Sequence, residues 1–296
     1  MIELRDLQIL TALARHQHFA KAAQDCGMSQ PAFSMRIRNL EEKLGLSIVR
    51  RANRFQGLTE EGEMIVRRAR SILDDARALE QEIAASRGEV TGTLVLGVVP
   101  TATAFAAQVA DRVRQAYPRI LVQVDVTTSL SIQQRLYDGS IDAGVTYSDS
   151  IGPDLVTVQP LYEESYVLMA PAAMVEDAGD QISWADASEL PLSLLDRQMQ
   201  NRRILDAIFE EQGLKPRIMS ESSGFMASMV MARRGSVATI LPRALAEALG
   251  PLEDTRVLTL VEPEQARPIC IATLNRQAEL TTVRALKEVV GEFGNS

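Results

Sequence analysis

The stretch SQPAFSMRIRNLEEKLG, residues 29–45, decides how the first part of this chain is interpreted. Ser29 is a typical helix cap, and Pro31 fits the first helical turn, where a missing N–H costs nothing. At about 100° per residue, one face of the helix is apolar and predicts a buried stripe formed by Phe33, Ile37, Leu40 and Leu44. The opposite face carries Pro31, Ser34, Met35 and Arg38, with Gln30 and Arg36 at its borders.

Two interpretations fit such a helix. A plain surface helix has the same apolar stripe and a solvated face. A helix that enters the major groove of DNA uses its N-terminal half, where Gln pairs with adenine and Arg with guanine. The first two turns are polar or basic, whereas Glu41 and Glu42 come later and are expected to repel phosphates. In the second interpretation the DNA contacts are Ser29, Gln30, Pro31, Ser34, Arg36 and Arg38.

The neighbouring segments favour the second interpretation. Apolar spacing predicts a helix over residues 4–16, and FAKAAQDCG (19–27) predicts a short one that Gly27 ends. Two short helices around a tight glycine turn are typical of a helix-turn-helix. The segment GLSIVRRANRFQGLT (45–59) predicts a basic hairpin, a wing suited to backbone or minor-groove contact. Its arginines Arg51 and Arg54 join the predicted DNA contacts.

These segments resemble the N-terminal signature of the LysR-type transcriptional regulators. The signature has an alanine-rich helix, then Ser-Gln-Pro-Ala-x-Ser, Ile-x-x-Leu-Glu, Leu-Gly, and an arginine-bearing wing that ends in Leu-Thr-x-x-Gly. The matching residues are Ala22, Ala23, Ser29–Ser34, Ile37, Leu40, Glu41, Leu44, Gly45, Arg51, Arg54, Leu58, Thr59 and Gly62. Two positions depart: His18 replaces the usual serine of the second helix, and Met35 replaces a frequent arginine. The exact base contacts around Met35 therefore stay open.

After the wing, residues 59–86 run without proline and predict one long helix capped by Thr59. Its apolar positions recur with a period of about 3.5 residues, which is typical of a helix that packs along another helix. This seam is formed by Ile65, Ala69, Ile72, Ala76, Leu79 and Ile83. The alternative is that the seam packs against its own domain. The resemblance implies a linker helix that pairs with a second copy, and a dimer of dimers.

Composition and charge agree with a small, basic DNA-binding domain followed by a larger, acidic part of the chain. The 296 residues suit two or three compact units, and a net charge of −8 is unevenly distributed. Residues 1–58 hold nine Lys/Arg and five Asp/Glu, a balance of +4 that leaves −12 for the remainder. No apolar run is long enough for a membrane span and no leader pattern is present, which predicts a cytoplasmic protein. Two cysteines are too few for a disulfide framework.

From about residue 90 onward, strand and helix patterns alternate, which predicts βαβ units and a parallel sheet. A second α/β set follows, and the last strand and helix return to the first set. This order resembles the two-lobed, periplasmic-binding-protein-like effector domain of the same family. The expected fold is therefore a winged helix-turn-helix (1–58), a linker helix (59–89), effector lobe I (90–161 and 267–296) and effector lobe II (162–266).

Ligands of such α/β units bind beyond the carboxyl ends of the strands, between the lobes. Hydroxyl and amide side chains follow the predicted strands there and suit a small anion such as a carboxylate. We therefore expect effector contacts at Thr101, Thr103, Thr128, Ser129, Thr146, Gln200, Asn201 and Ser222. The alternative is that these residues are ordinary helix caps. Arg202 and Arg203 are expected to face water.

The pattern contains no catalytic cluster, no Cys/His group with metal spacing and no nucleotide-binding fingerprint, so we predict no enzyme activity, metal or cofactor. The predicted function is a bacterial, sequence-specific transcription regulator controlled by a small, anionic effector. Its expected partners are double-stranded DNA, the effector, further copies of itself and RNA polymerase. Two rivals stay open: an architectural DNA-binding protein whose body only oligomerises, and an enzyme or transport-type binding protein with a helical head.

Overall fold

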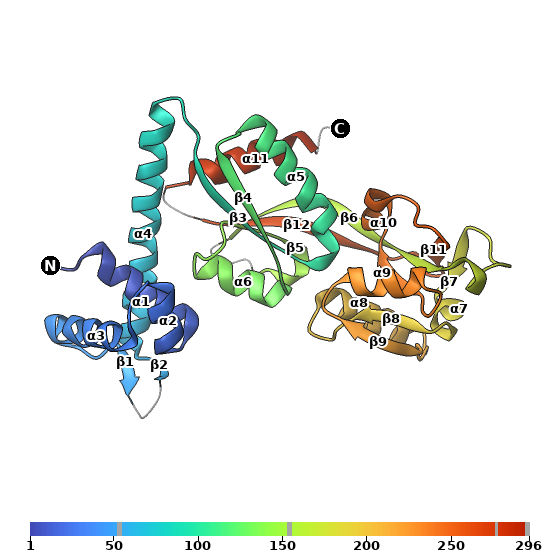
Figure 1. The fold of residues 1–296 in the computed structure, drawn as a ribbon, viewed down its shortest axis with the longest axis horizontal. Coiled ribbons are helices and arrows are strands. Elements are labelled where there is room, and N and C mark those ends of the chain that lie inside the picture. Colours follow the sequence, from blue (N-terminus) through green and yellow to red (C-terminus); the bar gives the residue numbers. More distant parts are fainter. Residues whose placement is uncertain (52–54, 153–155, 276–277, 294–296) are drawn as a thin grey trace. The chain divides into compact units, whose positions relative to one another are not determined.

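The computed structural model describes residues 1–51, 55–152, 156–275 and 278–293. They form two compact units, one of residues 1–91 with 276–284 and one of residues 92–275 with 285–296 (Figure 1). Each unit is described by itself.

The N-terminal unit begins as a winged helix-turn-helix, as predicted. Its elements are α1 (Leu4–His16), α2 (Phe19–Asp25), α3 (Gln30–Leu44), β1 (Val49–Arg51), β2 (Phe55–Leu58) and α4 (Glu60–Ser86). The strands β1 and β2 pair antiparallel to form the wing. The long helix α4 follows the wing directly and is the longest helix in Figure 1.

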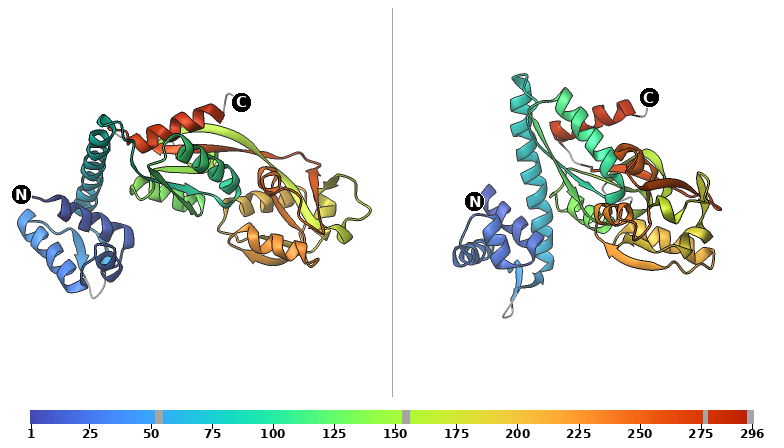
Figure 2. Two further views of the ribbon diagram at one scale, coloured as in Figure 1. Left: turned by 45° about the horizontal axis from the view of Figure 1, so that its top comes forward. Right: turned by 45° about the vertical axis from the view of Figure 1, so that its right-hand side comes forward.

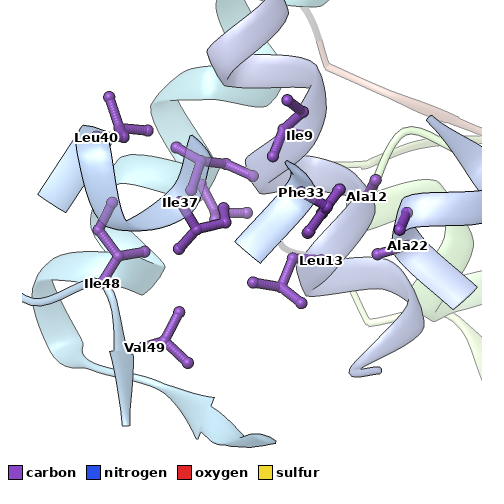
Figure 3. Packing of buried hydrophobic residues seen from close by; sticks show 12 residues of the cluster. Ile9, Ala12, Leu13, Ala22, Phe33, Ile37, Leu40, Ile48 and Val49 are labelled. Atoms are coloured by element: carbon purple, nitrogen blue, oxygen red, sulfur yellow. The ribbon is translucent and has the colours of Figure 1, made fainter. Parts of the chain in front are cut away.

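The apolar stripe of α3 fixes this helix in its domain. Phe33, Ile37 and Leu40 are at most 3% exposed and pack against α1 side chains such as Ile9 and Leu13 (Figure 3). Each buried side chain of this size stabilises the fold by about 1.5–3 kcal/mol. The core therefore sets which face of α3 points outward.

Helix ends in this unit follow the sequence signals. The Ser29 hydroxyl accepts from the N–H of Ala32, and Gly45 ends α3 with a φ of 68°. At the start of α2, the His18 ring takes the place of the family's serine. Its Nδ1 accepts from the backbone N–H groups of Ala20 and Lys21, at 3.2 and 3.4 Å.

The junction between wing and long helix is tight. The Thr59 hydroxyl accepts from the N–H of Gly62 at 2.9 Å and caps α4. A side chain at Gly62 would overlap the carbonyl oxygen of Ile48, so only glycine allows this approach. Near the other end, Gln81 of α4 accepts a hydrogen bond of 3.1 Å from the hydroxyl of Thr281, a residue of the same unit.

The first half of the C-terminal unit is a βαβ sheet. Its elements are β3 (Gly92–Val98), η1 (Pro100–Ala102), α5 (Thr103–Ala116), β4 (Ile120–Val126), α6 (Ser129–Tyr137), β5 (Ala143–Tyr147), η2 (Ser148–Ser150) and α11 (Thr281–Phe293). The strands β4, β3 and β5 run parallel in that order, with Val98 opposite both Val126 and Val145. Their carboxyl ends therefore share one edge of the sheet.

The second half holds a further set of helices and strands. They are η3 (Ala172–Met174), β7 (Gln181–Ser183), α7 (Trp184–Glu189), β8 (Leu192–Leu195), α8 (Gln200–Glu211), β9 (Ile218–Ser222), α9 (Phe225–Arg233), β10 (Thr239–Pro242), α10 (Arg243–Leu249) and β11 (Thr255–Val261). The strands β8 and β9 pair in parallel, and a single bridge joins Leu192 to Ala238 just before β10. Figure 2 shows both halves of this unit from two further directions.

Two long strands connect the halves. β6 (Val156–Pro171) pairs with β12 (Ala266–Leu274) along its first part and with β10 and β11 along its second part. In the sequence, Pro160 and the charged residues Glu163 and Glu164 obscure the beginning of β6. The ladder tolerates Pro160 beside an irregularity between Ile269 and Cys270, where a strand can carry a residue without an N–H.

A buried carboxyl group lies where β6 leaves the first half. Glu164 is 2% exposed, and its Oε1 accepts a hydrogen bond of 2.7 Å from the Tyr147 hydroxyl. The Thr101 hydroxyl lies 3.2 Å from that of Tyr147 and extends the chain of polar groups. Burial raises the pKa of Glu164 to about 7, against the lowering effect of the bond from Tyr147.

The raised pKa predicts a pH-dependent stability. An unfolded glutamate has a pKa of about 4.3, so the folded state binds the extra proton between that value and about 7. The free energy of unfolding should therefore fall as pH rises through this window, by up to about 4 kcal/mol. Glu164→Gln cannot ionise and should flatten the dependence, measured by thermal unfolding of the full chain from pH 5 to 8. Glu163→Gln, at an exposed neighbour, serves as the control; an unchanged slope in Glu164→Gln would contradict the assignment.

Candidate functional sites

The outward face of α3 carries the predicted DNA contacts. Gln30, Pro31 and Arg38 are exposed, and Ser34 is half-buried. No described residue forms an ion pair with Arg38. The hydroxyl of Ser29 already accepts from a backbone N–H as the helix cap. The free side chains thus lie on the first turns of α3, where a helix in the major groove contacts bases.

Arg36 has a different environment from Arg38. Its Nε donates to Asp6 and its Nη2 to Glu3, both at 2.9 Å, so it ties α3 to the start of α1. Burial alone would raise the pKa of Asp6, but the Glu3 N–H and the Arg36 guanidinium lower it overall. These bonds favour a role for Arg36 in positioning α3 rather than in contacting bases.

The expectation that Glu41 repels phosphates is wrong, because its side chain is turned into the domain. Glu41 is 8% exposed, and its Oε1 accepts from the backbone N–H groups of Ile48 and Val49 at 2.9 and 3.1 Å. This carboxylate therefore holds the start of the wing against α3. Only Glu42 of the pair is exposed.

The wing is described in part. Arg50 is exposed on β1. The side chain of Arg51 and the whole of Arg54 lie outside the described residues. Their predicted contacts with DNA stay predictions.

In the C-terminal unit, the predicted effector residues of the first half lie at or just after the carboxyl ends of parallel strands, along one sheet edge. Thr101 and Tyr147 share a hydrogen bond, and the Thr103 hydroxyl donates to the carbonyl of Pro100 at 3.0 Å. Thr128 caps α6 by accepting from the N–H of Ser131. Ser129 and Thr146, both buried, bond to each other at 2.9 Å. The strand order brings these residues to one edge, and most of their hydroxyls already have partners within the fold.

The second half contributes the start of α8. Asn201 is 2% exposed, and neither its Oδ1 nor its Nδ2 has a hydrogen-bond partner among the described residues. No side chain caps the N-terminus of α8, which begins at Gln200. Ser222, at the end of β9, donates to the carbonyl of Gly224 at 2.8 Å. Among the predicted effector residues, Asn201 is therefore buried with polar atoms that have no hydrogen-bond partner in the described part of the chain.

The expectation that Arg202 faces water is wrong. Arg202 is 1% exposed, and its guanidinium donates to Asp206 at 2.8 Å and to Glu221 at 2.9 Å. It also donates to the carbonyl of Leu195. The two carboxylates neutralise its charge, whereas Arg203 is exposed as expected.

The seam of α4 divides into two parts. Ile65 packs against the core of the winged domain, and Ala69 is buried. Further along, Ile72, Leu79 and Ile83 are 47%, 57% and 48% exposed. The alternative of packing within the domain therefore applies to the beginning of the seam, while its later part presents apolar side chains to the outside.

Sequence patterns missed Glu164, Tyr147 and the capping role of His18. Glu164 stands in a run of two glutamates, and only its neighbours in space distinguish it from the exposed Glu163. His18 gave a weak signal, because it directly precedes a predicted helix. A histidine in that position can accept from backbone N–H groups as a serine does.

The described part of the chain contains no group of three or more His, Cys, Asp or Glu side chains that could hold a metal ion. None of its helices is both long and apolar enough to cross a membrane. Cys26 and Cys270 are free, and burial raises the pKa of both thiols.

Comparison with known proteins assigns both units. Residues 4–63 match the family described as "Bacterial regulatory helix-turn-helix protein, lysR family". Residues 87–294 match the "LysR substrate binding domain". Between the two matches runs most of α4.

Among similar proteins is a probable hydrogen peroxide-inducible genes activator of Streptomyces viridosporus, 31% identical over 91% of this chain and 87% of that protein. The transcriptional regulator AlsR of Bacillus subtilis is 27% identical over 81% and 80% of the two chains.

Solved structures show the same fold along the whole chain. A cysteine-to-aspartate variant of full-length OxyR from Pseudomonas aeruginosa aligns with a TM-score of 0.73 at 23% identity, covering 99% of this chain and 95% of that one. Full-length CbnR in complex with its target DNA aligns with a TM-score of 0.65 at 21% identity, covering 99% and 100%. With its helix-turn-helix DNA-binding domain and its α/β effector-binding domain, the chain belongs to the LysR family of transcription regulators.

Proposed function

We propose that this regulator contacts its operator with the outer face of α3 from Gln30 to Arg38, and that it changes its output when a small molecule binds between the halves of the C-terminal unit. The observation that carries the first part is the free, exposed group of Gln30, Pro31 and Arg38 on a helix fixed by its buried opposite face. A similar fold, CbnR, has been solved with its target DNA. Ser34 and the wing arginines Arg51 and Arg54 complete the proposed interface.

The recognition surface predicts selective losses of DNA binding. Arg38→Ala should weaken binding to an operator duplex by about 5- to 150-fold, since a good contact with guanine contributes about 1–3 kcal/mol. Gln30→Ala should relax the choice of base at one position of each half-site. The measurement is a titration of the full chain against duplexes selected from a random pool. Arg114→Ala, an exposed arginine of the effector domain, is the matched control; normal affinity in both α3 variants would exclude this surface.

For the effector, we propose a site at the sheet edge that carries Thr101, Thr103, Thr128, Ser129 and Thr146, closed by Gln200, Asn201 and Ser222 from the second half. Asn201 supports this placement best. Leaving a buried polar group unpaired costs about 1–3 kcal/mol, and both polar atoms of this amide are unpaired. A ligand that pairs with them recovers that cost.

The proposed ligand is a small anion that also carries a hydrogen-bond donor. The uncapped N–H groups at the start of α8 and the Asn201 Nδ2 suit a carboxylate, and the Oδ1 accepts from a neighbouring donor. Arg202 contributes little charge to the ligand, because Asp206 and Glu221 neutralise it.

A non-covalent ligand fits this chain better than an oxidant of thiols, although a relative is described as a hydrogen peroxide-inducible genes activator. Its two cysteines, Cys26 and Cys270, are in different units, and Cys270 is fully buried. Raised pKa values keep both thiols protonated, and thiolates are the reactive form.

Asn201→Leu separates folding from effector binding. The leucine is similar in size and removes two unpaired polar atoms, so the melting temperature of the full chain should stay the same or rise. Small carboxylic acids that raise the melting temperature of the wild type should lose this effect in Asn201→Leu. They should keep it in Gln198→Leu, an exposed neighbour, and in a variant with both cysteines replaced. If no acid stabilises the wild type, the effector proposal fails; if Asn201→Leu still responds, the site is elsewhere.

We also propose that two copies pair through the later part of α4. Ile72, Leu79 and Ile83 form an exposed apolar row with the period of a helix-packing seam. Beside it, a groove of about 450 Å³ between α1 and α4 is lined by Leu73 and Ala76 together with polar and charged side chains such as Arg77 and Glu80. Two paired heads can bind two half-sites of one operator.

If two copies pair through the exposed part of the seam, charges placed there should separate them. Leu79→Lys with Ile83→Lys should shift the chain toward the monomer in sedimentation experiments and lower operator affinity at least tenfold, since one head then binds alone. Val230→Lys, similarly exposed on α9, should leave assembly unchanged. A stable dimer of the double variant would show that the seam is not the interface.

The wider scheme follows from these parts. The proposed division is DNA-binding residues 1–58, linker 59–89, and effector lobes 90–161 with 267–296 and 162–266. In this scheme the effector biases the closure of the lobes, which redirects paired heads and changes DNA bending or contact with RNA polymerase. A tetramer and action in the cytoplasm, where operator DNA lies, belong to the same proposal.

A further inference from the structure

Met35 is a large apolar side chain on the outer face of α3. It is 59% exposed, whereas Phe33 and Ile37 on the same helix are at most 1% exposed. At about 100° per residue it projects about 40° from Pro31 and about 60° from Arg38 around the helix axis. Met35 therefore belongs to the face that carries the proposed DNA contacts.

The domain does not use Met35 for its own stability. The hydrophobic core of the winged helix-turn-helix does not include it among the described residues. Met35 is one of the residues that line a groove of about 440 Å³, together with Ala32, Arg36 and Asn39. Arg36 in that groove is held by Asp6 and Glu3. An exposed methionine without a partner is consistent with a surface that becomes covered in a complex.

The chemistry of this side chain limits what it can contact. A thioether has no N–H or O–H donor and no charge, so it cannot pair with guanine or neutralise a phosphate. Among the base edges of the major groove, thymine alone presents an apolar group, its C5-methyl. Methionine is flexible and polarisable and adapts to such a small apolar group.

We propose that Met35 contacts the C5-methyl group of a thymine and thereby specifies a T·A pair at one position of each half-site. This inference rests on the proposed entry of α3 into the major groove. The contact buries apolar surface on both partners and adds no charge. It therefore contributes to sequence preference and leaves the salt dependence of binding unchanged.

Deoxyuridine provides the test, because it differs from thymidine only in lacking the C5-methyl group. Duplexes selected by the full chain from a random pool are resynthesised with each thymine replaced in turn by deoxyuridine, and affinities are measured for wild type and Met35→Ala. At one position per half-site, deoxyuridine should weaken binding by wild type about three- to tenfold. At that position Met35→Ala should bind the thymidine duplex and the deoxyuridine duplex equally. At every other thymine, replacement by deoxyuridine should change the affinity of Met35→Ala as it changes that of the wild type.

The control variant is Met226→Ala, which removes a methionine that is 68% exposed on α9 of the effector domain. It should reproduce the wild-type pattern at every thymine. If Met35→Ala also shows the wild-type pattern, the proposed contact is excluded. If Arg38→Ala and Gln30→Ala retain normal affinity as well, the recognition surface itself is misplaced; if they lose affinity, only the thymine contact is overturned. Because Met35 is exposed, its truncation should leave the melting temperature unchanged, which separates these outcomes from misfolding.

Discussion

The DNA-facing surface depends on one constraint: α3 has to bury Phe33, Ile37 and Leu40 against α1. That burial determines the rotation of the helix about its axis, and so determines which side chains point outward. Arg36 adds a second restraint by bonding to Asp6 and Glu3. A recognition helix needs this rigidity, because a contact between a side chain and a base edge tolerates only small displacements.

Local patterns predicted the elements of this head well, because caps and apolar periodicity act over a few residues. They failed where a partner is distant in the chain. Arg36 meets Asp6 across 30 positions, and Glu41 turns inward to the N–H groups of Ile48 and Val49. In a list of charged residues, these two are indistinguishable from Arg38 and Glu42.

The same limit applies to the effector-binding unit. The order of strands and the sheet edge were predictable, since parallel strands connected by helices bring their carboxyl ends together. The start of β6 was not, because Pro160 suggests an interruption that a strand irregularity accommodates. Nor could the sequence separate Arg202, neutralised and buried, from the exposed Arg203 beside it.

The contact at Gly62 has a mechanical consequence. Since the backbone of α4 lies against the carbonyl of Ile48, with no room for a side chain, the first turn of α4 and the base of the wing cannot shift independently. Glu41 in turn fastens that base to α3. The winged domain and the first turns of the long helix therefore move together as one rigid body. A small tilt at the far end of α4 displaces the whole winged domain and does not deform it.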